Sequence, residues 1–311
     1  MSIWWINFAS AGERARLSMI SIVLPTWNRC AFLAEAVGSV VSQRIPDWEL
    51  VIVDDGSTDG TGAWLASLDD SRIRVLQTRP GETGTGVAGT RNLGARKAQG
   101  EWICFLDDDD RLHSATLAHL HATIETMGDV RWIWGRRWIT DAEGRATHLE
   151  AGEEVLIDQD APESAHFAAA KLVTSGLTVH RNTFLHVGGF DESLCVSEDR
   201  DLVYRLIANG CTGIRVPEPF VWFREHDAPR ASSVDGYAEK NASDLRVVER
   251  NLDYLQAHPE VFSMHLHRVA SRQRKAGDIE SARDTVRMIL DIMPGNWKAR
   301  RRWLAWNVVN G

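Results

Sequence analysis

Short apolar runs alternate with segments of helical periodicity through the first third of the chain. The runs Ile20–Leu24, Glu49–Val53 and Ile73–Gln77 have the length and composition of buried strands. Between the first two, apolar side chains recur at helical spacing, and Asn28 is expected to cap that helix. Another helix is expected after Gly60. This alternation predicts right-handed crossovers and a half-domain of the nucleotide-binding type.

A fourth run, Trp102–Leu106, is followed directly by four carboxylates, Asp107–Asp110. The run predicts a buried strand, whose carboxyl end lies where open α/β sheets bind ligands. Adjacent carboxylates repel one another, and a shared hard cation such as Mg²⁺ or Mn²⁺ would relieve that repulsion. A solvated acidic turn after a strand is the alternative that this run alone leaves open.

Between residues 111 and 230 the pattern mixes short strands with short helices. Gly135 is expected to break the strand that contains it, and residues 150–160 are acidic and loop-like. The segment Ser197–Asp201 is expected to cap a helix that ends at Asn209 and Gly210. Further helices are expected at 114–127 and 181–186, and strands at 131–140, 174–180, 214–216 and 220–223.

Beyond about residue 232 the pattern is wholly helical. One helix is expected over 244–256, and the residues from 263 onward resemble a single tetratricopeptide repeat with its turn at residues 276–278. One such unit cannot bury its own apolar face, so it is expected to pack on its neighbours. Tryptophans and basic side chains are interleaved between Trp297 and Trp306. This stripe fits either a membrane or partner contact, or core tryptophans beside a solvated basic face.

The composition narrows the classes of protein to consider. Hydrophobic residues are 44% and charged residues 25% of the 311 residues, which is ordinary for a globular protein with one or two domains. The net charge of -8 argues against a nucleic-acid binder, and the four scattered cysteines are expected to be free thiols.

No run is long enough to span a membrane, and residues 1–18 lack the features of a secretory signal. We therefore expect a cytoplasmic protein, either free or peripheral at the inner face of the membrane.

The glycines Gly84, Gly86 and Gly89 match the spacing of a dinucleotide-binding fingerprint, with Asp107 near the distance of a ribose-binding acid. That fingerprint opens directly from a strand, whereas residues 78–83 intervene here after the third run. A single ribose acid would also leave the other three carboxylates unexplained. A glycine-rich loop that brings backbone amides to a diphosphate agrees with either interpretation.

Six motifs occur in the order found in the family 2 glycosyltransferases, which the chain resembles over roughly residues 21–226. They are IVLPTWNR (22–29), VIVDDGSTDG (51–60), RNLG (91–94), FLDDDD (105–110), GGFDE (188–192) and ED (198–199). The resemblance implies a GT-A fold, which is an α/β architecture with a mostly parallel central sheet flanked by helices. It also implies a nucleotide-diphosphate sugar donor, a divalent metal, Mn²⁺ or Mg²⁺, and inversion at the anomeric carbon.

The same resemblance implies a division of the chain. Residues 19–230 would form the GT-A domain, with a nucleotide-binding half at 19–110 and an acceptor-binding half at 111–230. Residues 1–18 would be an N-terminal arm and residues 231–311 a helical C-terminal region.

The resemblance implies seven residues that contact the nucleotide-sugar donor, and two of them, Asp107 and Asp108, belong to the acidic run. By resemblance, Pro25, Thr26 and Asn28 would lie beside the nucleoside, and Asp55 would meet the imide of a uracil or thymine ring. Arg91 would contact the base or the phosphates. UDP and dTDP are therefore the favoured carriers.

The metal site would be built from the acidic run. Asp107 would reach the ribose, and Asp109 would ligate the ion that bridges the diphosphate. The carboxylate of Asp108 departs from the family pattern, and it leaves open which of Asp107 to Asp109 is the first ligand. His226 would lie near the diphosphate and the metal, unless it is a structural histidine.

The catalytic base is expected at the start of the helix after residue 197. A departing nucleoside diphosphate needs charge stabilisation rather than a proton donor, so one carboxylate suffices to deprotonate the acceptor hydroxyl. Asp199 is the expected base, and Glu198 would hold the acceptor or replace it. Alternatively, both acids simply favour the positive end of their helix.

The expected partners follow from this chemistry. The donor is a nucleotide sugar, the acceptor is a glycan or a lipid-linked glycan, and the C-terminal helices are a candidate contact with the membrane. A catalytically silent sugar-nucleotide-binding scaffold is the alternative function.

Overall fold

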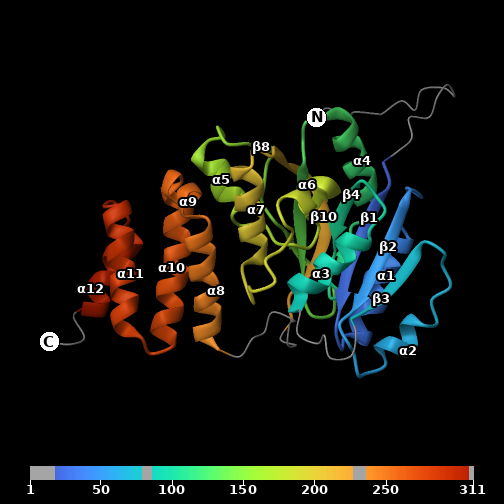
Figure 1. Cartoon of the computed structure of the whole chain (residues 1–311), viewed down its shortest axis with the longest axis horizontal. Coiled ribbons are helices and arrows are strands. Elements are labelled where there is room, and N and C mark those ends of the chain that lie inside the picture. The colour runs from blue at the N-terminus through green and yellow to red at the C-terminus, as the bar shows by residue number, and fades with distance from the viewer. Residues whose placement is uncertain (1–17, 79–85, 227–235, 308–311) are drawn as a thin grey trace.

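The computed structural model describes residues 18–78, 86–226 and 236–307 (Figure 1). Within these ranges ten strands form one sheet. The strands are β1 (Ile20–Thr26), β2 (Trp48–Asp54), β3 (Ile73–Gln77), β4 (Trp102–Phe105), β5 (Arg111–Leu112), β6 (Trp132–Thr140), β7 (Ala146–Leu149), β8 (Val155–Ile157), β9 (Thr178–His180) and β10 (Gly213–Arg224). The helices are α1 (Cys30–Val41), α2 (Thr61–Leu65), α3 (Gly86–Lys97), α4 (Thr116–Thr126), α5 (Glu163–Ala169), α6 (Arg181–His186), α7 (Glu198–Ala208), α8 (Tyr237–Arg250), α9 (Leu252–Ala257), α10 (Pro259–Lys275), α11 (Ile279–Ile292) and α12 (Trp297–Asn307).

Three expectations fall wholly or partly outside the described residues. These are the N-terminal arm except for its last residue, the glycine loop including Gly84, and the boundary at residue 230 between the two predicted regions. The division into domains therefore stays a prediction.

The sheet has the order β3-β2-β1-β4-β9-β6-β10-β5, with β7 paired to β6 and β8 to β10. The four strands at the β3 end are parallel, as the alternation of strands and helices predicts. Beyond them the sheet is mixed, because β9 runs antiparallel to both β4 and β6. The expected α/β class is confirmed, and the chain order reverses between β1 and β4, which is where such sheets bind ligands.

Side chains of β1 alternate between two apolar layers, because successive residues of a strand point to opposite faces. Ile22 packs in the layer that contains Leu33 of α1, whereas Val23 packs in the layer that contains Ala95 of α3. Gly94 lets α3 approach the sheet closely, since a Cβ there would lie 2.5 Å from the Cγ1 of Val23. The glycine of the RNLG motif is therefore a packing requirement.

Several expected elements differ in the structure. Asn28 does not cap α1, because the structure places Arg29 at that position and gives it no side-chain capping bond. Gly135 does not break its strand: β6 runs through it, and a Cβ there would lie 2.5 Å from the Phe220 ring of β10. The two expected strands around Pro217 and Pro219 form the single strand β10. The acidic segment 150–160 contains β8, and α5 follows it.

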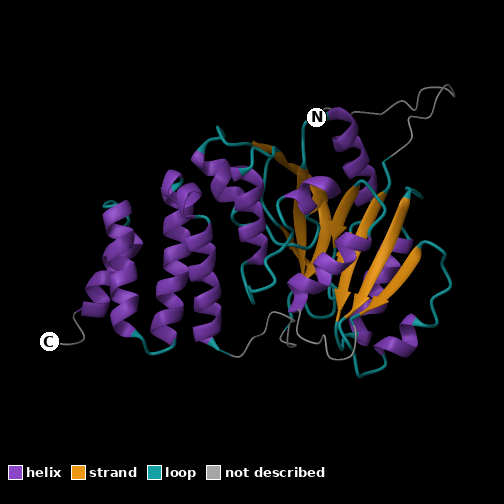
Figure 2. Cartoon of the chain, viewed as in Figure 1, coloured by secondary structure: helices purple, strands orange, loops and turns teal. Residues whose placement is uncertain are grey.

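The C-terminal region is helical, as expected, and its helices stand side by side next to the sheet layer (Figure 2). The turn between α10 and α11 has Gly277 at φ 87°, a left-handed conformation that favours glycine. The Asp278 side chain caps α11 by accepting a hydrogen bond from the Ser281 N–H at 3.1 Å. Trp306 is buried whereas Trp297 is 63% exposed, so the tryptophans of α12 divide between the core and the surface.

Candidate functional site

The polar residues at the ends of three strands meet in one cleft of about 200 Å³. Thr26 ends β1, Asp55 follows β2, and the acidic run follows β4, so the parallel register brings these positions together at one edge. Arg91 of α3 and Asp199 of α7 line the same cleft. The cleft therefore joins residues from both predicted halves, 19–110 and 111–230.

Arg91 is the buried cation of this cleft. Its side chain is 4% exposed, and it donates to Asp107 Oδ1 and, at 2.9 Å, to Glu198 Oε1. Burial by itself lowers the pKa of Arg91, but the charges of Asp107 and Glu198 raise it above its ordinary value. The guanidinium is therefore permanently charged and connects the acidic run to α7.

Asn92, the next residue of the RNLG motif, fixes the GGFDE motif. Its Nδ2 donates to the Phe190 carbonyl oxygen at 2.8 Å, and its Oδ1 accepts from the Phe190 N–H at 2.9 Å. Gly189 has φ 67°, and a Cβ there would lie 2.5 Å from Asn92 Oδ1. The two motifs are thus in direct contact, although they are about a hundred residues apart in sequence.

The acidic run contains a group of carboxylates suited to a metal. One oxygen from each of Asp107, Asp109 and Asp110 lies within 4.8 Å of the others. Asp110 is buried; its Oδ1 accepts from the Arg224 N–H at 2.9 Å, and its Oδ2 has no hydrogen-bond partner among the described residues. Burial, followed by the charges of Asp109 and Asp107, raises the pKa of Asp110 well above its ordinary value.

This donor set fits a hard divalent cation. Carboxylate oxygens are the ligands that Mg²⁺ and Mn²⁺ prefer, and a cation there would satisfy the unpaired oxygen of Asp110. From the sequence, Asp109, Asp107 and His226 were predicted to bind the metal, and Asp110 was not singled out. The position of Asp110 directly after three other acids was the sequence signal that could have identified it.

Asp108 has a different environment from its neighbours. Its Oδ2 accepts a hydrogen bond from the Thr26 hydroxyl at 2.8 Å, and it lines the cleft. Burial, with the adjacent charge of Asp109, raises its pKa to about 7. The additional carboxylate therefore connects β4 to β1 and lies outside the three-carboxylate group.

Asp109 has two cationic or potentially cationic neighbours. Arg29 Nη1 lies 3.3 Å from Asp109 Oδ2, and His226 Nε2 lies 3.0 Å from the same oxygen. The His226 ring stacks on Phe32 with a centroid distance of 5.1 Å. The expected placement of His226 beside the acidic run agrees with this geometry. Arg29 was not assigned a role, although it ends the IVLPTWNR motif.

Asp55 presents an unpaired acceptor to the cleft. Its Oδ1 is buried with no hydrogen bond of normal geometry among the described residues, and burial raises its pKa against the opposing effect of the nearby Thr78 and Thr90 hydroxyls. Such an oxygen fits the imide N–H of a bound pyrimidine. Pro25 also lines the cleft, whereas Asn28 does not. The Asn28 side chain instead accepts from the Thr58 N–H at 2.7 Å, with the Asn28 backbone at φ 52°.

The two acids that begin α7 have unequal surroundings. Glu198 is ion-paired with Arg91, and its pKa is raised by burial and then by Asp199, against the opposing effect of Arg91. Both acids line the cleft, and Asp199 accepts from the Arg200 N–H at 2.8 Å, with Arg200 Nη1 at 3.4 Å. Asp199 is therefore better placed to act on a ligand, and Glu198 to hold Arg91.

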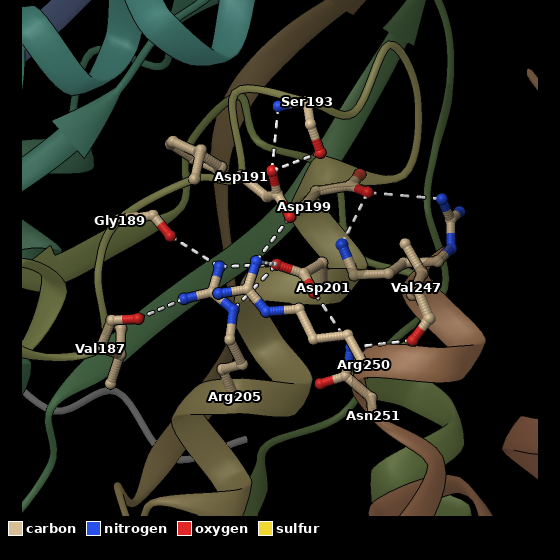
Figure 3. Close-up of polar contacts among 12 residues, drawn as sticks. Val187, Gly189, Asp191, Ser193, Asp199, Asp201, Arg205, Val247, Arg250 and Asn251 are labelled. Carbon is tan, nitrogen blue, oxygen red and sulfur yellow. Dashed lines mark hydrogen bonds and ion pairs between the residues drawn. The ribbon is translucent and has the colours of Figure 1, made fainter. Parts of the chain in front are cut away.

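A buried network fixes the helix that carries these acids (Figure 3). Asp201 is fully buried; it accepts from Arg205 Nε at 2.8 Å and from Asn251 Nδ2 at 2.9 Å. Arg250 of α8 pairs with Asp191 of the GGFDE motif at 2.6 Å. The C-terminal helices thus contact both α7 and the loop before it.

A mixed α/β sheet with an acidic cluster and a buried arginine at its switch point is an arrangement of the GT-A type. Residues 21–171 match the family described as Glycosyl transferase family 2. Residues 21–171 are accordingly a family 2 glycosyltransferase domain, as the motifs predicted.

Three similar proteins illustrate the range of the family. An uncharacterized glycosyltransferase of Haemophilus influenzae is 26% identical over 82% of this chain and 88% of its own length. The Escherichia coli UDP-Glc:alpha-D-GlcNAc-diphosphoundecaprenol beta-1,3-glucosyltransferase WfgD is 37% identical, over 38% of this chain and 45% of its own length. The structure of S. aureus TarS 1-349 in complex with UDP-GlcNAc superposes with a TM-score of 0.69, at 17% identity, over 87% of this chain and 81% of that chain. That last likeness concerns the fold.

Among the described residues, every helix is too short or too polar to cross a lipid bilayer.

Proposed function

We propose that this glycosyltransferase moves a sugar from a nucleoside-diphosphate donor, with UDP favoured, to an acceptor hydroxyl with inversion at the anomeric carbon. The observation that carries the proposal is that Asp199, Asp55 and the first three acids of the acidic run line one cleft. The acceptor is proposed to be a glycan or lipid-linked glycan, in keeping with the lipid-diphosphate substrate in the name of WfgD. The cytoplasmic location and the peripheral membrane contact stay predictions.

The cleft divides into a nucleotide part and a diphosphate part. Asp55 would accept from the base, with Pro25 and Thr26 beside the nucleoside. Asp107, Asp109 and Asp110 would hold Mn²⁺ or Mg²⁺, which would supply charge stabilisation for the leaving diphosphate.

The reaction is proposed to be a single displacement. Asp199 takes the proton of the acceptor hydroxyl while that oxygen forms a bond to the anomeric carbon from the face opposite the diphosphate. The bond between the anomeric carbon and the phosphate oxygen breaks, and its electron pair leaves with the nucleoside diphosphate. Attack from the opposite face inverts the configuration.

The role of Asp199 is tested by Asp199→Asn, with Asp253→Asn on the exposed surface of α9 as the control. We expect the release of UDP from a UDP-sugar, with water or a glycan as acceptor, to fall by about 10²- to 10⁴-fold in Asp199→Asn. UDP binding in the presence of Mn²⁺ should stay unchanged. Near-normal turnover would assign the base to another residue, with Glu198 the first to examine.

The donor class is tested by thermal shift with UDP, dTDP, GDP and NADH, each with and without Mn²⁺. Stabilisation by UDP or dTDP that increases with Mn²⁺ is the expected result. Stabilisation by NADH alone would favour the dinucleotide interpretation. Donor binding without any turnover would favour the silent scaffold.

A further inference from the structure

The C-terminal helices carry a groove of about 1050 Å³ that is larger than the catalytic cleft. We call it the basic groove. Its lining comes from α5, α8, α10 and α12, with Phe167, Tyr237, Lys275, Trp297 and Lys298 among its residues. The tryptophans and basic residues of α12 are visible in the sequence, but only the structure shows that they border a concave surface.

The basic groove is strongly positive in a chain whose net charge is -8. Six lysine or arginine residues line it, against the single carboxylate of Glu260. Two of the six, Arg268 and Arg272, face the buried carboxylate of Asp244. The remaining four have no ion pair with a carboxylate among the described residues; they are Lys240, Lys275, Lys298 and Arg302.

Exposed aromatic rings stand beside these cations. Trp297 is 63% exposed and Tyr237 is 47% exposed. Lys298 Nζ lies 5.9 Å from the centroid of the Trp297 ring, and Lys275 Nζ lies 5.3 Å from that of Tyr237. A flat ring beside a cation suits a sugar unit that has an apolar face and carries an anionic group.

A third pocket shares one lining residue with the catalytic cleft and another with the basic groove. Val173 lines the cleft and also a neighbouring pocket of about 410 Å³. Phe167 of α5 lines that pocket and also the basic groove. Lys171 and Arg215 contribute positive charge to the pocket between them. Figure 1 shows α5 between the sheet and the C-terminal helices.

We propose that the basic groove binds the distal part of an anionic glycan acceptor, a sugar chain that bears phosphate or carboxylate groups. This inference rests on the proposed function, because the other end of the chain would present its hydroxyl to Asp199. Charge complementarity selects an anionic occupant. The concave shape of the groove, and the pocket that adjoins both the groove and the cleft, favour a chain over the flat surface of a membrane.

The test compares binding of an oligogalacturonate with that of a neutral maltooligosaccharide of the same length, both to the full chain. The groove variant is Lys275→Gln/Lys298→Gln, and the control is Arg44→Gln/Arg287→Gln, which removes two exposed positive charges elsewhere. We expect oligogalacturonate to bind and the maltooligosaccharide not to. The groove variant should bind oligogalacturonate about three- to tenfold more weakly than the control, and added salt should weaken binding to the wild type.

Three results would overturn the proposal. They are equal affinity of the groove variant and the control, equal binding of the neutral and the anionic chain, and sedimentation with phosphatidylglycerol-rich vesicles when oligogalacturonate does not bind. The last result would assign the groove to a membrane surface. UDP binding with Mn²⁺ is measured on the same samples, so loss of the donor function is distinguished from failure of the groove.

Discussion

Removal of the Asp201 carboxylate should destabilise the whole protein, because it leaves a buried charge without its partner. Asp201 is fully buried, and its Oδ2 lies 2.7 Å from Arg205 Nη2 as well as 2.8 Å from Nε (Figure 3). In Asp201→Ala the guanidinium of Arg205 keeps only its bonds to the carbonyl oxygens of Val187 and Gly189. Breaking one partner of a buried ion pair costs about 3–5 kcal/mol of unfolding free energy.

The loss should be visible in two assays. Urea unfolding should show a lower midpoint with an unchanged slope, and the thermal midpoint should fall by roughly 6–15 °C. Asp201→Asn removes the charge but keeps the size of the side chain and an oxygen that can accept from Asn251 Nδ2. It should therefore retain part of the unfolding free energy that Asp201→Ala loses. Asp253→Ala on the exposed face of α9 should change the free energy by less than about 0.5 kcal/mol.

A loss of less than about 1 kcal/mol of unfolding free energy in Asp201→Ala, with Asp253→Ala behaving as expected, would refute the role given to the buried ion pair. That result would mean that the two carbonyl oxygens and solvent suffice for Arg205. A double-mutant cycle with Arg205→Ala would then give a coupling energy near zero instead of the large value expected for a buried pair.

Two further predictions concern the metal site and the sheet. Mn²⁺ should bind at least about tenfold more tightly at pH 8 than at pH 6, because a cation must displace the proton that Asp108 retains up to its pKa of about 7, and because the pKa of the proposed ligand Asp110 is raised as well. Isothermal titration at several pH values checks this. Asp108→Asn should reduce the pH dependence and leave the part that comes from Asp110; an unchanged dependence would exclude Asp108 as a proton holder. Gly213→Ala should lower the unfolding free energy by about 1–3 kcal/mol or more, because its Cβ would lie 1.9 Å from the buried Trp132 ring. Gly62→Ala in α2 has open space around the new Cβ and should be neutral or stabilising in the same urea assay.

The N-terminal half of the fold was predictable because local signals agreed there. Ile20, Ile22 and Leu24 alternate with Val23 on a strand buried on both faces, and the next helix presents an apolar stripe at the correct spacing. The short strands β5, β7 and β8 have little local signal of their own. β5 and β8 form because β10 offers a partner that is distant in sequence, whereas β7 pairs with the preceding strand β6 across a short turn.

The location of the candidate site was predictable, because the carboxyl ends of neighbouring parallel strands determine which residues lie together. Acids after β2 and β4 had to meet at one edge, and they do. The selection among adjacent acids was not predictable, because Asp108 faces Thr26 while Asp110 faces the backbone of β10. Such a choice depends on contacts between segments about a hundred residues apart, which spacing does not encode.

Asn28 illustrates the same limit at shorter range. Its sequence context, just before an apolar helical stripe, is typical of a helix cap. The structure holds it at a positive φ, which asparagine tolerates better than most residues, and its side chain accepts from the loop after β2. The asparagine of the first motif therefore organises the VIVDDGSTDG loop beside Asp55 and reaches the nucleotide site indirectly.

The C-terminal helices take part in positioning the two acids at the start of α7. Asp244 of α8 is fully buried and accepts from the Ser197 hydroxyl at 2.7 Å, one residue before Glu198. The same carboxylate pairs with Arg272 of α10 in the basic groove. Because one buried carboxylate joins the start of α7 to the groove, an occupant that moved Arg272 would act on the backbone that carries Asp199. The acceptor site and the base would then be coupled through Asp244, over contacts that the periodicity of the helices alone could not reveal.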